Sequence, residues 1–215
     1  MSPVSLSARV RRGFTLIELL AVILIIGILA AALTPMVTEA VRSAEVAACK
    51  KNLQNIYQGL ILYKQKYNGI PNQGGVRFFA DLIARGAIEN TKANAERLTC
   101  PGVEKASLGI RDLPWEDWWT DLETVNGTYS AYAGRDMKNQ PLRQFPGSGR
   151  EPLVSDDNDG GMNHHTTTNV LYADGNVQTF ELVDEQNKGT ITKDDTVLVV
   201  GPDSPIPDLT KLSLD

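Results

Sequence analysis

The feature that most constrains this chain is a helical pattern that begins at Phe14 and continues to Tyr67. Its first part, residues 14–37, contains 24 residues and is almost uniformly apolar. At about 1.5 Å per residue, such a helix spans about 36 Å, enough to cross a hydrocarbon core of about 30 Å. The sequence therefore predicts one membrane-spanning helix near the N-terminus.

The second part of the pattern, residues 38–67, is one-sided. Apolar residues recur at steps of three and four, which is typical of an amphipathic helix that packs on a folded domain. Pro35 lies between the two parts and is expected to kink or locally melt the helix, because it removes one backbone hydrogen bond. The apolar positions are Val46, Cys49, Leu53, Ile56, Tyr57, Leu60, Tyr63 and Tyr67.

Charges near the N-terminus predict an orientation and a functional residue. Arg9, Arg11 and Arg12 precede the apolar segment, so the positive-inside rule places the N-terminus in the cytoplasm and the following domain outside. Glu18 lies inside the apolar segment, where a charge costs about 2.5–3.5 kcal/mol at the helix centre and less toward an end. A plain anchor would be better without this carboxylate, so its purpose is expected to be assembly.

The run Gly13-Phe14-Thr15-Leu16-Ile17-Glu18 resembles the prepilin signature of type IV pilins and type II secretion pseudopilins. The resemblance implies cleavage between Gly13 and Phe14 by a prepilin peptidase in the bacterial inner membrane, followed by N-methylation of Phe14. It further implies that Glu18 pairs with the Phe14 amine of a neighbouring subunit. A second interpretation remains open, in which Glu18 complements the positive end of its own helix.

The function that the resemblance implies is structural. The chain would be a non-enzymatic subunit of a type II secretion pseudopilus or a type IV pilus-like filament, extracted by an inner-membrane assembly platform and packed with other pilin or pseudopilin subunits. It would begin as a single-pass inner-membrane protein and end in a periplasmic or cell-surface filament. The alternative is a minor or tip pilin that binds a ligand or an exported substrate.

The expected fold class is α+β and pilin-like, with the long helix packed on a small antiparallel sheet. Within the head we expect a short helix at 78–85, strands at 128–133 and 152–155, and a two-residue hairpin turn at Asp174-Gly175. A further strand is expected in 190–200, followed by an extended or loosely docked tail. The expected domains are a leader (1–13), the membrane or filament-core half of the helix (14–37), its amphipathic half (38–67), the head (68–185) and a C-terminal extension (186–215).

The segment 164–180 resembles the H-X9-DG domain found in many bacterial prepilin-like proteins. His164 is separated by nine residues from Asp174-Gly175, and Cys100-Pro101 resembles a Cys-Pro element of the same proteins. Residues 165–167 depart from the pattern. No chemistry accompanies this resemblance, so the motif is expected to fix the hairpin.

Two cysteines, Cys49 and Cys100, fall in the part predicted to be exported, where a disulfide is chemically permitted. Pairing cannot be derived from sequence, because it depends on the distance between the two Cα atoms. A disulfide and two separate, partly buried thiols are therefore both open.

The acidic loop at 156–161 is a candidate calcium site, because Asp156, Asp157 and Asp159 offer hard oxygen ligands beside glycines. Its calcium-binding interpretation is strengthened by the resemblance to major pseudopilins; the alternative is a solvated acidic turn. His164-His165 could instead hold zinc with these aspartates, but adjacent residues of an extended segment point to opposite faces, so a metalloenzyme is not expected.

Composition restricts the remaining function classes. Without residues 1–13 the chain has 18 basic and 26 acidic residues, and this acidic body argues against a nucleic-acid surface. There is no Gly-x-Ser-x-Gly nucleophile motif and no other catalytic set. All the tryptophans lie at Trp115, Trp118 and Trp119, where they are expected to fill a core, with an exposed carbohydrate-stacking surface as the alternative.

Overall fold

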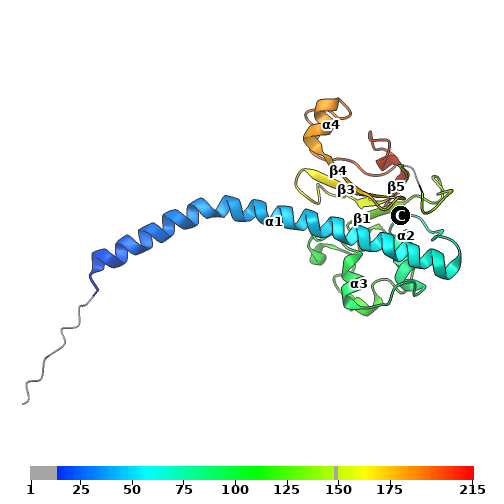
Figure 1. Cartoon of the computed structure of the whole chain (residues 1–215), viewed down its shortest axis with the longest axis horizontal. Coiled ribbons are helices and arrows are strands. Elements are labelled where there is room, and N and C mark those ends of the chain that lie inside the picture. The colour runs from blue at the N-terminus through cyan, green and yellow to red at the C-terminus, as the bar shows by residue number, and fades with distance from the viewer. Residues whose placement is uncertain (1–13, 148–149) are drawn as a thin grey trace, which may run out of the picture. The chain divides into compact units, whose positions relative to one another are not determined.

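The structure is a computed structural model that describes residues 14–147 and 150–215 (Figure 1). The chain divides into two compact units, with the boundary after Val41. The helices are α1 (Leu16–Tyr67), α2 (Val76–Ala84), α3 (Lys92–Arg97) and α4 (Leu182–Lys188), and the 3-10 turns are η1 (Lys105–Ser107), η2 (Trp115–Asp117), η3 (Gly127–Tyr129) and η4 (Leu209–Lys211). The strands are β1 (Tyr132–Arg135), β2 (Pro152–Asp156), β3 (Thr167–Tyr172), β4 (Val177–Glu181) and β5 (Leu212–Ser213).

The helix α1 is continuous through Pro35, so the expected local melting does not occur. The hydroxyls of Thr34 and Thr38 donate to backbone carbonyls four residues earlier, at 2.9 and 3.1 Å. The apolar side chains of its first half are exposed, and by length and composition the helix is able to cross a membrane. Burial begins at Cys49, which agrees with the change from an all-round to a one-sided apolar pattern.

The head contains one five-stranded antiparallel sheet in the order β4-β3-β2-β1-β5. This sheet and the long N-terminal helix confirm the α+β, pilin-like fold class. The short helix α2 ends where expected, at the left-handed Gly86. The strand expected at 128–133 instead begins only at Tyr132, because residues 127–129 form the 3-10 turn η3.

Both faces of the sheet are buried, and different parts of the chain cover them. One face packs against the second half of α1 and against α2, with Leu53, Phe79 and Tyr132 fully buried between them (Figure 1). The other face is covered by the C-terminal segment, whose Leu198, Leu209 and Leu212 are fully buried.

The expectations for the C-terminal extension were therefore wrong. Residues 190–200 contain no strand, and α4 was not foreseen. The tail is not loosely docked, because β5 pairs with β1 and the hydroxyl of Tyr172 donates to Asp208 at 2.6 Å. The prolines of this segment suggested an extended chain. Its leucines instead complete a second hydrophobic core on the sheet face that the C-terminal segment covers.

The predicted hairpin is present as β3 and β4, but its turn is not the two-residue type. The amide of Gly175 donates to the carbonyl of Tyr172, which makes Ala173 and Asp174 the central turn residues. Gly175 follows with a positive φ of 87°, so the connection is a three-residue loop with a glycine bulge. A side chain there would be strained and would also meet the ring of Tyr57.

The tryptophans belong to the core, as expected. Trp119 is fully buried against Phe79 and Tyr129, and its indole N–H donates to the carbonyl of Ala95 at 3.0 Å. Trp118 is also buried, and Trp115 is half-buried beside the same core. The exposed stacking surface that motivated a binding role is therefore not present.

Candidate metal centre and assembly segment

Four potential metal-ligand atoms meet inside the head. They lie within 4.8 Å of one another, and all four residues are buried. Among the described residues, this is the one group of three or more His, Cys, Asp or Glu side chains close enough to hold a metal ion. We call it the buried cluster; its members are Cys49, Cys100, Asp156 and His164.

Each member of the buried cluster comes from a different part of the fold. Cys49 begins the buried face of α1, and Cys100 follows α3 in the Cys-Pro loop. Asp156 is the last residue of β2, and His164 lies in the loop between β2 and β3. The cluster therefore ties the long helix, the Cys-Pro loop and the sheet together.

The carboxylate oxygen Oδ1 of Asp156 is the centre of the contacts. It lies 3.1 Å from Cys49 Sγ, 3.4 Å from Cys100 Sγ and 3.4 Å from His164 Nε2. The same histidine nitrogen lies 3.2 Å from Cys100 Sγ. The hydroxyl of Tyr132 borders the group, 3.5 Å from Cys49 Sγ.

A second layer of hydrogen bonds holds Asp156 in place. Its other oxygen, Oδ2, accepts from the backbone N–H of Asn169 at 2.7 Å and from the side-chain amide of the same residue at 3.1 Å. The 157–166 loop is anchored by Asn163, whose side chain donates to the carbonyl of Ala131 at 2.8 Å. Oδ1 is thereby turned toward the cysteines and His164.

The ionisable groups of the buried cluster change one another's pKa values. Burial opposes a charge on His164, but its hydrogen bonds to Asp156 and Cys49 raise its pKa to about 10. Burial likewise opposes ionisation of Cys49, yet hydrogen bonds from Cys100 and His164 lower its pKa. Burial raises the pKa of Cys100. Without a counter-cation, the group therefore depends on His164 to offset buried negative charge.

The two histidines are separated as the sequence predicted for neighbours. His165 has a positive φ of 51° and is exposed, whereas His164 is buried. The Nδ1 atom of His164 has no hydrogen-bond partner among the described residues. Gly102 packs against this ring so closely that a Cβ there would come within 2.7 Å of Nδ1.

The structure modifies the two expectations for the cysteines, a disulfide or two separate, partly buried thiols. Cys49 and Cys100 are free thiols here, but they are buried and adjacent rather than separate. The calcium ligands, by contrast, are not gathered. Asp156 belongs to the buried cluster, while Asp157 accepts from the Asp159 backbone and Asp159 is exposed.

Sequence reasoning considered each member of the buried cluster but not their convergence. For the cysteines the sequence left a disulfide and two separate thiols open. Asp156 was a candidate calcium ligand, and His164 was expected to fix the hairpin, with zinc binding beside the aspartates as the alternative. The sequence signal for the cluster was that Cys100-Pro101 and His164 both belong to the H-X9-DG resemblance. Two elements of one motif can form one site.

The assembly segment begins at the first described residues; Gly13 lies outside them. Thr15 caps α1, since its Oγ1 accepts from the backbone N–H of Glu18 at 3.3 Å. Glu18 reaches back with Oε2 to the Thr15 backbone N–H at 2.9 Å and accepts from the Thr15 hydroxyl at 2.7 Å. This reciprocal arrangement is a capping box.

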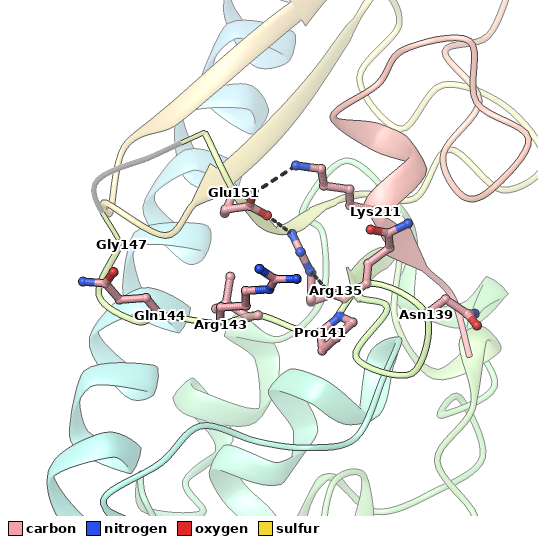
Figure 2. Close-up of a pocket in the computed structure, with 10 residues that line it drawn as sticks. Arg135, Asn139, Pro141, Arg143, Gln144, Gly147, Glu151 and Lys211 are labelled. Carbon is pink, nitrogen blue, oxygen red and sulfur yellow. Dashed lines mark hydrogen bonds and ion pairs between the residues drawn. The ribbon is translucent and has the colours of Figure 1, made fainter.

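A separate hollow of about 420 Å³ lies beside the sheet. Charged side chains gather around it, as Figure 2 shows. The guanidinium of Arg135 is buried and pairs with Glu151 at 2.8 Å, and Lys211 pairs with the same carboxylate at 3.2 Å. Arg135 also donates to the carbonyls of Gln140 and Pro152 at 2.6 and 3.0 Å. These ion pairs and hydrogen bonds connect β1 to the residues at the start of β2 and to η4.

Glu151→Gln is expected to lower the free energy of unfolding at pH 7 by about 1 kcal/mol, because the buried Arg135 loses its charged partner. Partial burial opposes ionisation of Glu151, but Arg135 and Lys211 lower its pKa. The contribution is therefore present above the ordinary carboxyl pKa and is lost as the pH falls through the lowered value. Urea unfolding at pH 7 and pH 3 measures both effects, with the exposed Glu123→Gln as the control. A stability gap as large at pH 3 as at pH 7 would contradict this account.

The N-terminal segment is similar to that of a known class. An apolar, capped helical segment that carries Glu18 shortly after Gly13-Phe14 is typical of type IV prepilin-like proteins. Residues 8–34 match the family model of the prokaryotic N-terminal methylation motif. No curated protein and no solved structure matches the chain.

Proposed function

We propose that this chain is a structural, non-enzymatic subunit of a type II secretion pseudopilus or a type IV pilus-like filament. The observation that carries the proposal is the match to the methylation motif on a helix whose residues 16–33 expose only apolar side chains and Glu18. Its partners would be the prepilin peptidase, other pilin or pseudopilin subunits and the inner-membrane assembly platform. The N-terminus would be cytoplasmic before processing and the head outside.

The capping box supports the role of Glu18 in its own helix, and it leaves room for a second role in assembly. Both hydrogen bonds from Thr15 go to the same oxygen, Oε2. The second carboxylate oxygen can therefore accept from the Phe14 amine of a neighbouring subunit while the cap stays closed. Such a pair would offset the desolvation of two charges and set the axial register between subunits.

The alternative of a minor or tip pilin that binds through its tryptophans is less well supported. Its motivating surface would be formed by Trp115, Trp118 and Trp119, and two of these are buried. A calcium loop would favour a pseudopilin over a pilin, but the carboxylates of the candidate loop do not converge on one point. The choice between the two filament types therefore rests on the assembly system of the host.

The processing test uses intact mass and N-terminal sequencing of the protein from host membranes. The expected N-terminus is methylated Phe14, and it should revert to the leader-bearing form when the prepilin peptidase is deleted. The sequence also leaves open a conventional signal peptide, which would be cut after the small residues Ala30-Ala31-Ala32. Such a cut, or an uncut protein in the peptidase-positive host, would refute the pilin pathway. Glu18→Gln should be processed normally, yet its incorporation into filaments should fall at least tenfold.

A further inference from the structure

The separations between ligand atoms in the buried cluster are close to those of a tetrahedral metal site. Zinc binds thiolate sulfur at about 2.3 Å and imidazole or carboxylate ligands at about 2.0–2.2 Å, which places neighbouring ligand atoms about 3.3–3.8 Å apart. The separations of Asp156 Oδ1 from its three neighbours are 3.1–3.4 Å, and Cys100 Sγ lies 3.2 Å from His164 Nε2, so these distances lie within or slightly below that range. A small inward or outward adjustment of side chains would accommodate an ion.

We propose that the head holds one structural Zn²⁺ ion in the buried cluster. The ligand atoms are Cys49 Sγ, Cys100 Sγ, Asp156 Oδ1 and His164 Nε2. This inference does not depend on the filament function, because it concerns only residues of the head and the part of α1 that packs in the same compact unit.

The ligand set favours zinc over calcium and a structural over a catalytic site. Calcium requires six to eight oxygen ligands, whereas two thiolates and an imidazole suit zinc. The thiolates and the carboxylate carry three negative charges, and a divalent cation offsets two of them inside a region closed to solvent. All four positions are taken by protein atoms, which is typical of structural zinc sites.

The surroundings of the buried cluster hold its ligands in place. Asn169 fixes the outer oxygen of Asp156 with two hydrogen bonds, an arrangement common around metal-bound carboxylates. The Gly102 backbone N–H bonds to Cys100, and the hydroxyl of Tyr132 lies beside Cys49 Sγ. These donors would stabilise thiolates once the thiol protons have been released to solvent on metal binding.

A disulfide between Cys49 and Cys100 explains less of the geometry. It would use the two sulfurs and remove the thiol protons that Asp156 Oδ1 now accepts. Asp156 and His164 would be left as a buried ion pair beside an apolar bridge, at an energetic cost. A metal ion instead engages all four polar groups at once.

The test is metal analysis of the full chain, purified in detergent from its host without chelators. Mass-spectrometric metal analysis is expected to give about one zinc per chain. Both thiols should resist a thiol reagent in the native protein, and both should react after denaturation with a chelator. A chain without zinc that carries two free thiols, calcium alone, or a mass lower by two hydrogens from a disulfide would each overturn the proposal.

The two adjacent histidines provide a matched pair of variants. His164→Asn is expected to lose nearly all the zinc, whereas the exposed His165→Asn should retain about one ion per chain. Equal zinc content in the two variants would overturn the proposal. Should His164→Asn fail to fold, cobalt exchange into the unmodified protein decides the matter. Thiolate-to-cobalt charge transfer and intense tetrahedral bands are expected, and octahedral cobalt without thiolate bands would refute the site.

Discussion

Removal of residues 204–215 is expected to unfold the head at room temperature. This segment supplies β5 and the buried side chains Ile206, Leu209 and Leu212, which cover one face of the sheet. Truncating one buried leucine to alanine costs about 2–5 kcal/mol, and a domain has only about 5–15 kcal/mol of stability in total. Losing three such residues and a strand together therefore exceeds what the head can tolerate.

Circular dichroism and urea unfolding measure this effect, and single substitutions grade it. Leu209→Ala should lower the free energy of unfolding by about 2–5 kcal/mol. Val199→Ala, just before this segment, should change it by no more than about 0.5 kcal/mol, because Val199 is 45% exposed. A truncated head that melted at the temperature of the parent would refute the assigned role of the C-terminal segment.

Trp119→Ala is expected to destabilise the head by about 3–5 kcal/mol, since it removes a fully buried indole from between Phe79 and Tyr129. It also leaves the carbonyl of Ala95 without its indole donor. Trp115→Ala should cost much less, because Trp115 is only half-buried.

The measurement is chemical unfolding monitored by the emission of the remaining tryptophans, which shifts to the red as the head unfolds. The midpoint should fall to a much lower denaturant concentration for Trp119→Ala than for Trp115→Ala. This pair also separates a core role from a ligand-binding role. If Trp119→Ala left the free energy of unfolding unchanged, the core role would be refuted. The tryptophans would then again be candidates for surface binding.

The sequence was most informative where one physical pattern dominated over many residues. The change at about residue 38 from an all-round to a one-sided apolar pattern located the membrane-grade half of α1 and the half that packs on the head. The hairpin was also predictable, because alternating runs flank a glycine that must adopt a positive φ. The type of turn could not be predicted, because Asp-Gly occurs in both two-residue and three-residue hairpin loops.

The C-terminal segment was misjudged for a physical reason. Pro202, Pro205 and Pro207 are typical of extended chain, and local pattern carries no information on a distant sheet face that needs covering. The apolar run at 197–200 favoured a strand, but it forms none; Leu198 inserts into the second core, and Val200 packs against the same core.

The buried cluster could not be derived because its members become neighbours only in the folded head. Cys49 and Asp156 are 107 residues apart, and Cys100 and His164 are 64 apart. Neither spacing belongs to a short metal-binding motif of the kind that sequence analysis detects.

The same separations have a consequence for the folding pathway. Long loops must close before Cys49 meets Asp156, so this contact is expected to form after local helices and the β3–β4 hairpin. During that interval both thiols are open to the oxidants of whatever compartment the head folds in. The order of events during biogenesis, rather than the final geometry alone, then determines whether the sulfurs reach the core in their reduced form.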